Sequence, residues 1–76
     1  MGETWSFVIH LEGLDQIIDS GLSFETLPVP GEVLELGQSP SRKGLYSFVS
    51  VQDLTGKDKR YGDRKRFEAW VEVVDP

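Results

Sequence analysis

Short runs in which apolar and polar residues alternate are the feature that most constrains the fold of this chain. The clearest run is 5–12, where Trp5, Phe7, Ile9 and Leu11 fall on one face and Val8 is the one apolar exception on the other. Alternation with a period of two places successive side chains on opposite faces, which predicts a half-buried β-strand. Residues 33–36 and 65–74 are typical of further strands by the same criterion, and the apolar run 45–54 is a further predicted strand.

The run at 45–54 is the longest apolar stretch, and it does not alternate cleanly. Tyr46 and Phe48 have the opposite parity from Leu45, Val49 and Val51. Such a pattern predicts either a strand that is covered on both faces or a strand with a β-bulge that switches faces.

Residues 14–24 have two interpretations. The pair Ile17-Ile18 and the following Gly21 are compatible with one short helix or helical turn near residues 14–20, because glycine is favoured just past a helix C-terminus. The β-branched pair and the continuing apolar positions Leu22 and Phe24 instead favour a strand. A helix of about seven residues is marginal without strong packing, so the strand is favoured.

Turn-forming residues separate these runs. Pro28 and Pro30 each remove a backbone donor, so the segment around them cannot be a central strand. Five short strands with frequent turn signals predict an all-β fold, a small five-stranded antiparallel barrel. At 76 residues the chain is expected to be a single domain, 1–76, with a basic hairpin arm at about 55–66.

Three segments together carry a resemblance to a known group of proteins. They are Leu27-Pro28-Val29-Pro30-Gly31-Glu32-Val33-Leu34-Glu35-Leu36, then Gly44-Leu45-Tyr46-Ser47-Phe48-Val49-Ser50-Val51, then Ala69-Trp70-Val71-Glu72-Val73. Over about residues 27–74 the chain resembles short uncharacterised phage and bacterial proteins that look like small SH3-like β-barrels. The resemblance implies an SH3-like fold and a phage or mobile-element origin, and it brings no catalytic residues with it.

Charge is segregated along the chain. All eight basic residues lie between Arg42 and Arg66, whereas residues 1–41 hold seven acids and no base. Segregated charge creates a field with two poles, which predicts that acidic and basic surfaces contact partners. Ordinary solubility and a solvated hairpin tip are the simpler interpretations of the same pattern.

The candidate binding residues combine cations with aromatic side chains. Cations and an exposed aromatic ring on one arm suit either an acidic protein surface or a nucleic-acid backbone with a stacked base. Trp70 has the polar parity of the last strand, and an exposed tryptophan is a good interface anchor. The predicted binding residues are Lys57, Lys59, Arg60, Tyr61, Arg64, Lys65, Arg66 and Trp70.

The chain lacks the residue patterns that metal sites, phosphate-binding loops and most catalytic sites require. The chain has no cysteine and one histidine, His10, and its glycines form no phosphate-binding loop. We therefore expect no metal, no cofactor, no small-molecule substrate and no enzymatic activity. No apolar stretch is long enough to span a membrane, and the N-terminus does not resemble a secretory signal, so a cytoplasmic protein without membrane contact is expected.

Two hypotheses for function follow. The first is a non-enzymatic protein–protein interaction module, in a phage or mobile-element setting an accessory protein or host-defence inhibitor, acting through its segregated acidic and basic surfaces. The partner is then another protein or a second copy of the chain, which would make an oligomer. The alternative is a small nucleic-acid-binding barrel that uses the basic hairpin arm.

Overall fold

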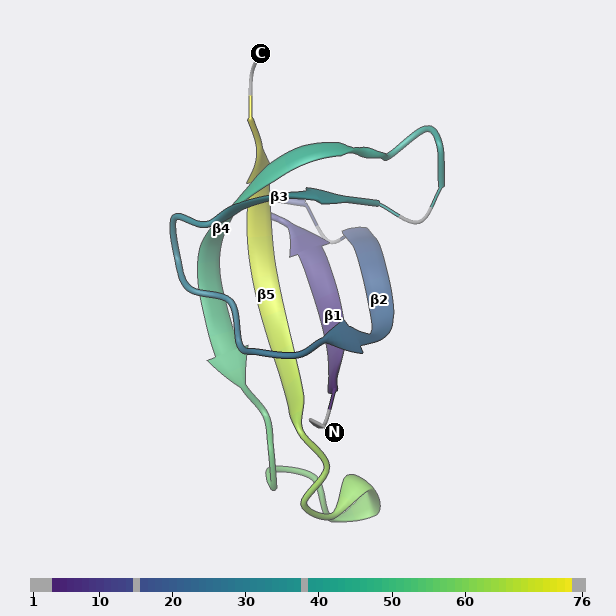
Figure 1. Ribbon diagram of the computed structural model, residues 1–76, viewed down its shortest axis with the longest axis vertical. Coiled ribbons are helices and arrows are strands. Elements are labelled where there is room, and N and C mark those ends of the chain that lie inside the picture. The colour runs from purple at the N-terminus through teal and green to yellow at the C-terminus, as the bar shows by residue number, and fades with distance from the viewer. Residues whose placement is uncertain (1–3, 15, 38, 75–76) are drawn as a thin grey trace.

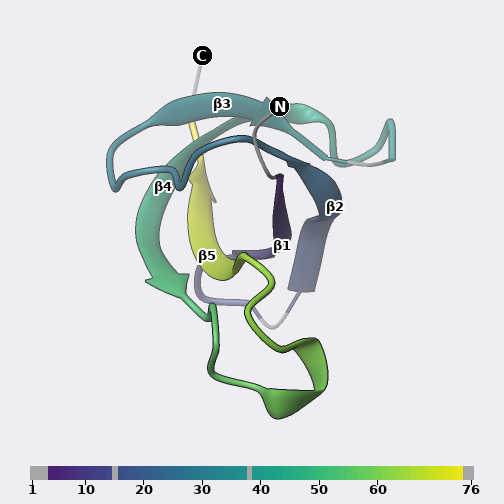
Figure 2. The ribbon, with the colours of Figure 1, turned by 60° about the horizontal axis from the view of Figure 1, so that its bottom comes forward.

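The computed structural model describes residues 4–14, 16–37 and 39–74. Its elements in chain order are β1 (Trp5–Leu11), β2 (Gln16–Phe24), β3 (Val33–Leu36), β4 (Gly44–Asp53), the 3-10 turn η1 (Lys59–Tyr61) and β5 (Arg66–Val73). The strands form one sheet that curls into a half-barrel (Figures 1 and 2). The predicted all-β class with five strands is confirmed. Of the seven acidic residues in 1–41, Glu3 and Asp15 lie outside the described residues.

The sheet is mixed, with the strand order β2-β1-β5-β4-β3. Three of its pairings are antiparallel, but β1 and β5 are parallel, from Ser6 opposite Arg66 to Leu11 opposite Val71. The prediction of an antiparallel sheet is therefore wrong at this pairing. The chain crosses from the β2 edge to the β3 edge through residues 25–32, and the β3-β4-β5 meander then brings β5 beside β1 in the same direction (Figure 1).

Residues 16–24 form strand β2, so the favoured interpretation of this stretch is confirmed and the helix near residues 14–20 is wrong. Pairing with β1 decides the conformation, because it buries Ile18 at 4% exposure. The register shifts between Ile9 and His10, which face Asp19 and Ile17 respectively. Ile17, which precedes Ile18 in the sequence, is 52% exposed on the outer face of the sheet.

Strand β4 carries a bulge, one of the two alternatives that its irregular pattern left open. The register with β5 shifts between Phe48 and Ser50. Phe48 is buried before the shift and Val51 packs against the core after it, while Val49 between them is exposed. The extra residue thus switches which parity faces the core.

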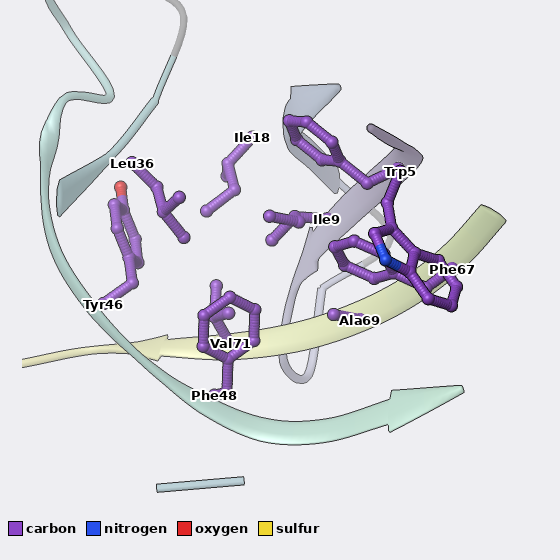
Figure 3. Close-up of a cluster of buried hydrophobic side chains, with 10 residues drawn as sticks. Trp5, Ile9, Ile18, Leu36, Tyr46, Phe48, Phe67, Ala69 and Val71 are labelled. Carbon is purple, nitrogen blue, oxygen red and sulfur yellow. The ribbon is translucent and has the colours of Figure 1, made fainter. Parts of the chain in front are cut away.

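The core lies on the concave side of the curled sheet, where side chains from all five strands meet (Figure 3). Phe7 and Phe67 stack with ring centroids 5.7 Å apart, and Phe24 contacts Phe67 edge to face at 5.3 Å. Such aromatic pairs bring large apolar area into a small domain. The buried hydrophobic residues that form this core are Trp5, Phe7, Ile9, Ile18, Leu36, Tyr46, Phe48, Phe67, Ala69 and Val71.

The two edge strands approach each other without a described ladder between them, so the expected closed barrel is a half-barrel. The seam is joined by side chains: the Asp19 carboxylate accepts from the Gly37 amide at 3.0 Å, and Arg42 Nη1 donates to the Ile17 carbonyl at 2.8 Å. Since β3 has only four residues, it is too short to pair along the nine of β2.

The single helical element in the described part of the chain is the three-residue turn η1. No helix there is of a length and hydropathy that would let it cross a membrane.

Candidate functional site

Most of the positive charge lies on one loop. Residues 54–66, which we call the basic loop, connect β4 to β5 and include the first residue of β5. The basic loop extends beyond the end of the sheet (Figure 1). It holds six of the eight bases and two acids, a net charge of +4, so the remainder of the chain carries −5 − 4 = −9.

The base of the basic loop is held by hydrogen bonds between its two ends. The Leu54 amide donates to the Arg66 carbonyl at 2.9 Å, and the Arg66 amide donates to the Thr55 hydroxyl at 3.1 Å. The Asp53 carboxylate accepts from the Thr55 amide at 2.8 Å. This bond, with a hydrogen bond from the Thr55 side chain, lowers the pKa of Asp53 below its usual value, and Lys57 and Lys65 nearby act in the same direction.

The tip of the loop is organised by Asp58. Its carboxylate caps η1 by accepting from the Arg60 amide at 3.0 Å, and it also accepts from Arg60 Nη2 at 2.9 Å. These bonds to the Arg60 side chain, and then the bond to its amide, lower the pKa of Asp58 to about 2. Gly62 ends the turn with a φ of +59°, a conformation that glycine adopts without strain.

Aromatic rings position two cations of the loop. The Arg66 guanidinium lies 4.0 Å from the centroid of the Tyr61 ring, within the range of a cation–π interaction. The Lys65 ammonium lies 5.3 Å from the Trp5 ring centroid. Tyr61 remains 45% exposed, so the aromatic ring expected on the arm is accessible to a partner.

Few acids oppose the loop cations directly. The ion pairs found in the described residues join Lys43 to Glu35 and Arg60 to Asp58, and His10 donates a hydrogen bond to Glu68. Among the loop cations, only Arg60 takes part in one of these pairs. Lys57, Lys59 and Arg64 are exposed, and the field of the loop is therefore positive.

Trp70 is separate from the loop cluster. It lies on the outer face of β5, as its parity predicted, but it is half-buried. Its ring stacks on His10 with centroids 5.3 Å apart, and His10 Nε2 donates to the Glu68 carboxylate at 2.8 Å. Sequence reasoning missed this cluster because His10 and Glu68 are 58 positions apart and meet only through the parallel pairing.

The acids of residues 1–41 have scattered roles. Asp19 accepts from the Gly37 amide, and Glu35 lies 3.8 Å from Lys43. Arg42 and Lys43 belong to the β3–β4 connection, away from the basic loop (Figure 1). Most of the basic residues therefore stay clustered in space, as they are in the sequence, whereas the acidic residues are spread over several parts of the fold.

No group of three or more candidate metal ligands occurs in the part of the chain that the structure describes. Comparisons with family models, with curated proteins and with solved structures found no match to this chain. The arrangement of the basic loop is therefore the basis for any functional assignment.

Proposed function

We propose that the chain is a non-enzymatic protein-interaction module whose basic loop docks onto an acidic surface of a partner protein. The observation that carries the proposal is the placement of six cations on one exposed, internally braced loop with a single ion pair among them. A braced loop loses less conformational entropy on binding than a disordered one. Charge complementarity of this kind would mainly raise the association rate and set the orientation of the partner.

A protein surface suits the charge distribution better than a nucleic acid does. The loop carries +4, while the rest of the chain carries −9. A nucleic acid that extended beyond the loop would run along this negative remainder and be repelled. A local acidic patch on a protein needs to match only the loop.

Trp70 is a second contact in this proposal. It follows Arg66 and Glu68 on the outer face of β5, so one partner could cover both the loop and this strand. The kinship with SH3-like barrels and a role as a phage or mobile-element accessory or host-defence inhibitor remain predictions from the resemblance. A cytoplasmic setting likewise remains an expectation.

The alternative function, binding of single-stranded nucleic acid, is favoured by one observation. Tyr61 is exposed and lies against Arg66, and such a ring can stack a base. Stacking contributes about 1–3 kcal/mol per base. If the chain binds single-stranded nucleic acid, Tyr61→Ala should weaken that binding far more than it weakens binding to an acidic protein surface.

The experiment that separates the two functions compares an acidic peptide with an oligothymidylate of equal length and net charge. Both are fluorescently labelled, and anisotropy is measured at low and high salt. We expect the peptide to bind more tightly at low salt and both to weaken as salt rises. Tighter binding of the oligothymidylate, lost in Tyr61→Ala, would overturn the proposed function in favour of the alternative.

A further inference from the structure

A groove lies at the end of the sheet opposite the basic loop, between the β3–β4 connection and the last residues of β5. Its volume is about 360 Å³, and the side chains that define it are Arg42, Lys43, Leu45, Tyr46, Val73 and Val74. Leu45 is 53% exposed and Val73 is 59% exposed, although the core is close by. The groove therefore presents apolar surface that folding does not cover.

The rim of the groove is cationic. Arg42 Nη1 donates to the Ile17 carbonyl at 2.8 Å, and the side-chain amide of Gln16 lies 2.9 Å from Nη2. Both neighbours are neutral, so the guanidinium keeps its charge, although part of its donor capacity faces β2. Lys43 has Glu35 at 3.8 Å, but both side chains are more than 60% exposed, and such surface pairs contribute little. None of the residues that line the groove is acidic.

A cationic rim above an apolar floor is complementary to a ligand that joins a carboxylate to an apolar side chain. We propose that this groove binds the C-terminal residue of a partner polypeptide. The apolar side chain lies against Leu45, Tyr46 and Val73. The terminal carboxylate lies between Arg42 and Lys43, which bind it through charge-assisted hydrogen bonds.

The openness of the groove favours a polypeptide over a free carboxylic acid. Small-molecule sites bury 70–90% or more of their ligand. A groove whose apolar walls are themselves about half exposed leaves a free small acid partly in water. A polypeptide gains further contacts outside the groove through the residues that precede its C-terminus. The site is distinct from the basic loop and does not depend on the function proposed for it.

The test is a titration of ¹⁵N-labelled protein, followed by amide chemical shifts. The probe is acetyl-Gly-Ser-Leu-Val with a free C-terminal carboxylate, and the matched probe is the same peptide with a C-terminal amide. We expect the carboxylate form to shift amides in residues 41–46 and 73–74. The amide form should bind about tenfold more weakly, because it lacks the charge-assisted hydrogen bonds.

Two variants locate the site. Lys43→Gln removes one rim charge without touching the core, and it should weaken the carboxylate peptide about three- to tenfold. Gly44→Val adds bulk at a groove-lining position where no atom lies within 4 Å of the added Cβ, and it should abolish binding. Should Gly44→Val fail to fold by circular dichroism, Lys43→Gln alone decides. Lys59→Gln in the basic loop is the control and should bind as the original protein does.

Three results would overturn the proposal: equal binding of the carboxylate and amide peptides, shifts outside the groove, or unchanged affinity in Lys43→Gln. Octanoate serves as a free carboxylic acid probe. Binding of octanoate without binding of the peptide would also overturn it, since the groove would then be a small-molecule site. Acidic-peptide binding by the basic loop is tested separately by Lys59→Glu.

Discussion

The Arg66 guanidinium lies 4.0 Å from the centroid of the Tyr61 ring, which joins the first residue of β5 to the tip of the basic loop. Together with the hydrogen bonds between Thr55 and Arg66, this contact braces a loop that otherwise lacks buried residues at its tip. Bracing keeps the cations of the loop in a fixed arrangement before any partner binds.

Tyr61→Ala should therefore loosen the loop without unfolding the sheet. An exposed cation–π contact contributes about 0.5–1 kcal/mol, which corresponds to about a two- to fivefold change in local opening. Limited trypsin digestion measures this opening as cleavage after Lys59, Arg60 and Arg64, which should be faster by that factor. Tyr61→Phe keeps the ring and serves as the control; equal cleavage rates for Tyr61→Ala and the original protein would contradict the bracing role.

The Asp58 carboxyl should titrate with a pKa of about 2, well below its ordinary value of 3.8. A lowered carboxyl pKa means that the cap of η1 is complete above the ordinary pKa and is lost as pH falls through about 2. The carboxyl ¹³C shift of Asp58 reports this titration. In Arg60→Ala the midpoint should rise toward 3.8, because the largest cause of the lowering is removed, and an unmoved midpoint would show that Arg60 does not hold the carboxylate.

Gly37→Ala should destabilise the seam between β2 and the β3–β4 connection. An added Cβ would lie 2.5 Å from the Arg42 carbonyl oxygen, and the φ of Gly37 is +111°. Gly31→Ala is a matched control, since Gly31 has a φ of +93° and no atom within 4 Å of the added Cβ. Urea unfolding should show Gly37→Ala to be less stable than Gly31→Ala by about 1–3 kcal/mol, the usual cost of overpacking. Equal stability of the two variants would mean that the backbone at Arg42 moves to accommodate the added methyl group at no cost in stability.

The neighbouring isoleucines of β2 provide a test of its register. Ile18 is buried against the core and Ile17 is half exposed on the outer face. Ile18→Ala should cost about 2–5 kcal/mol, and Ile17→Ala less than about 1 kcal/mol. The larger loss is a substantial part of the roughly 4–11 kcal/mol expected for a domain of this size. Similar losses at both positions in urea unfolding would contradict the described register.

The strands themselves could be predicted because alternation depends only on neighbouring residues. Trp5, Phe7 and Ile9 are all buried, as their shared parity indicated. The irregular parity around Phe48 likewise indicated a bulge as one of two alternatives, and the structure has the bulge. Period-two patterns identify which face of a strand is buried, and here they did so.

The direction of a pairing and the contacts that follow from it could not be predicted. Parity is the same for a parallel and an antiparallel neighbour, so nothing in residues 5–12 indicated that β5 runs parallel to β1. For the same reason the contacts of His10 with Glu68 and Trp70 were missed. The basic loop could be predicted as a cluster because its cations all lie between Lys57 and Arg66 in the sequence, whereas the topology disperses the acidic residues.

The most direct test of the proposed function compares two single charge reversals with the same change in net charge. Lys59→Glu lies in the basic loop, and Lys43→Glu lies in the β3–β4 connection; both side chains are exposed. Affinity for the acidic peptide, amidated at its C-terminus so that it offers no terminal carboxylate to the groove at Lys43, is measured by anisotropy at low salt. We expect Lys59→Glu to weaken binding about tenfold and Lys43→Glu to change it less than about twofold. Equal weakening by both reversals would show that net charge alone, and not the basic loop, determines binding.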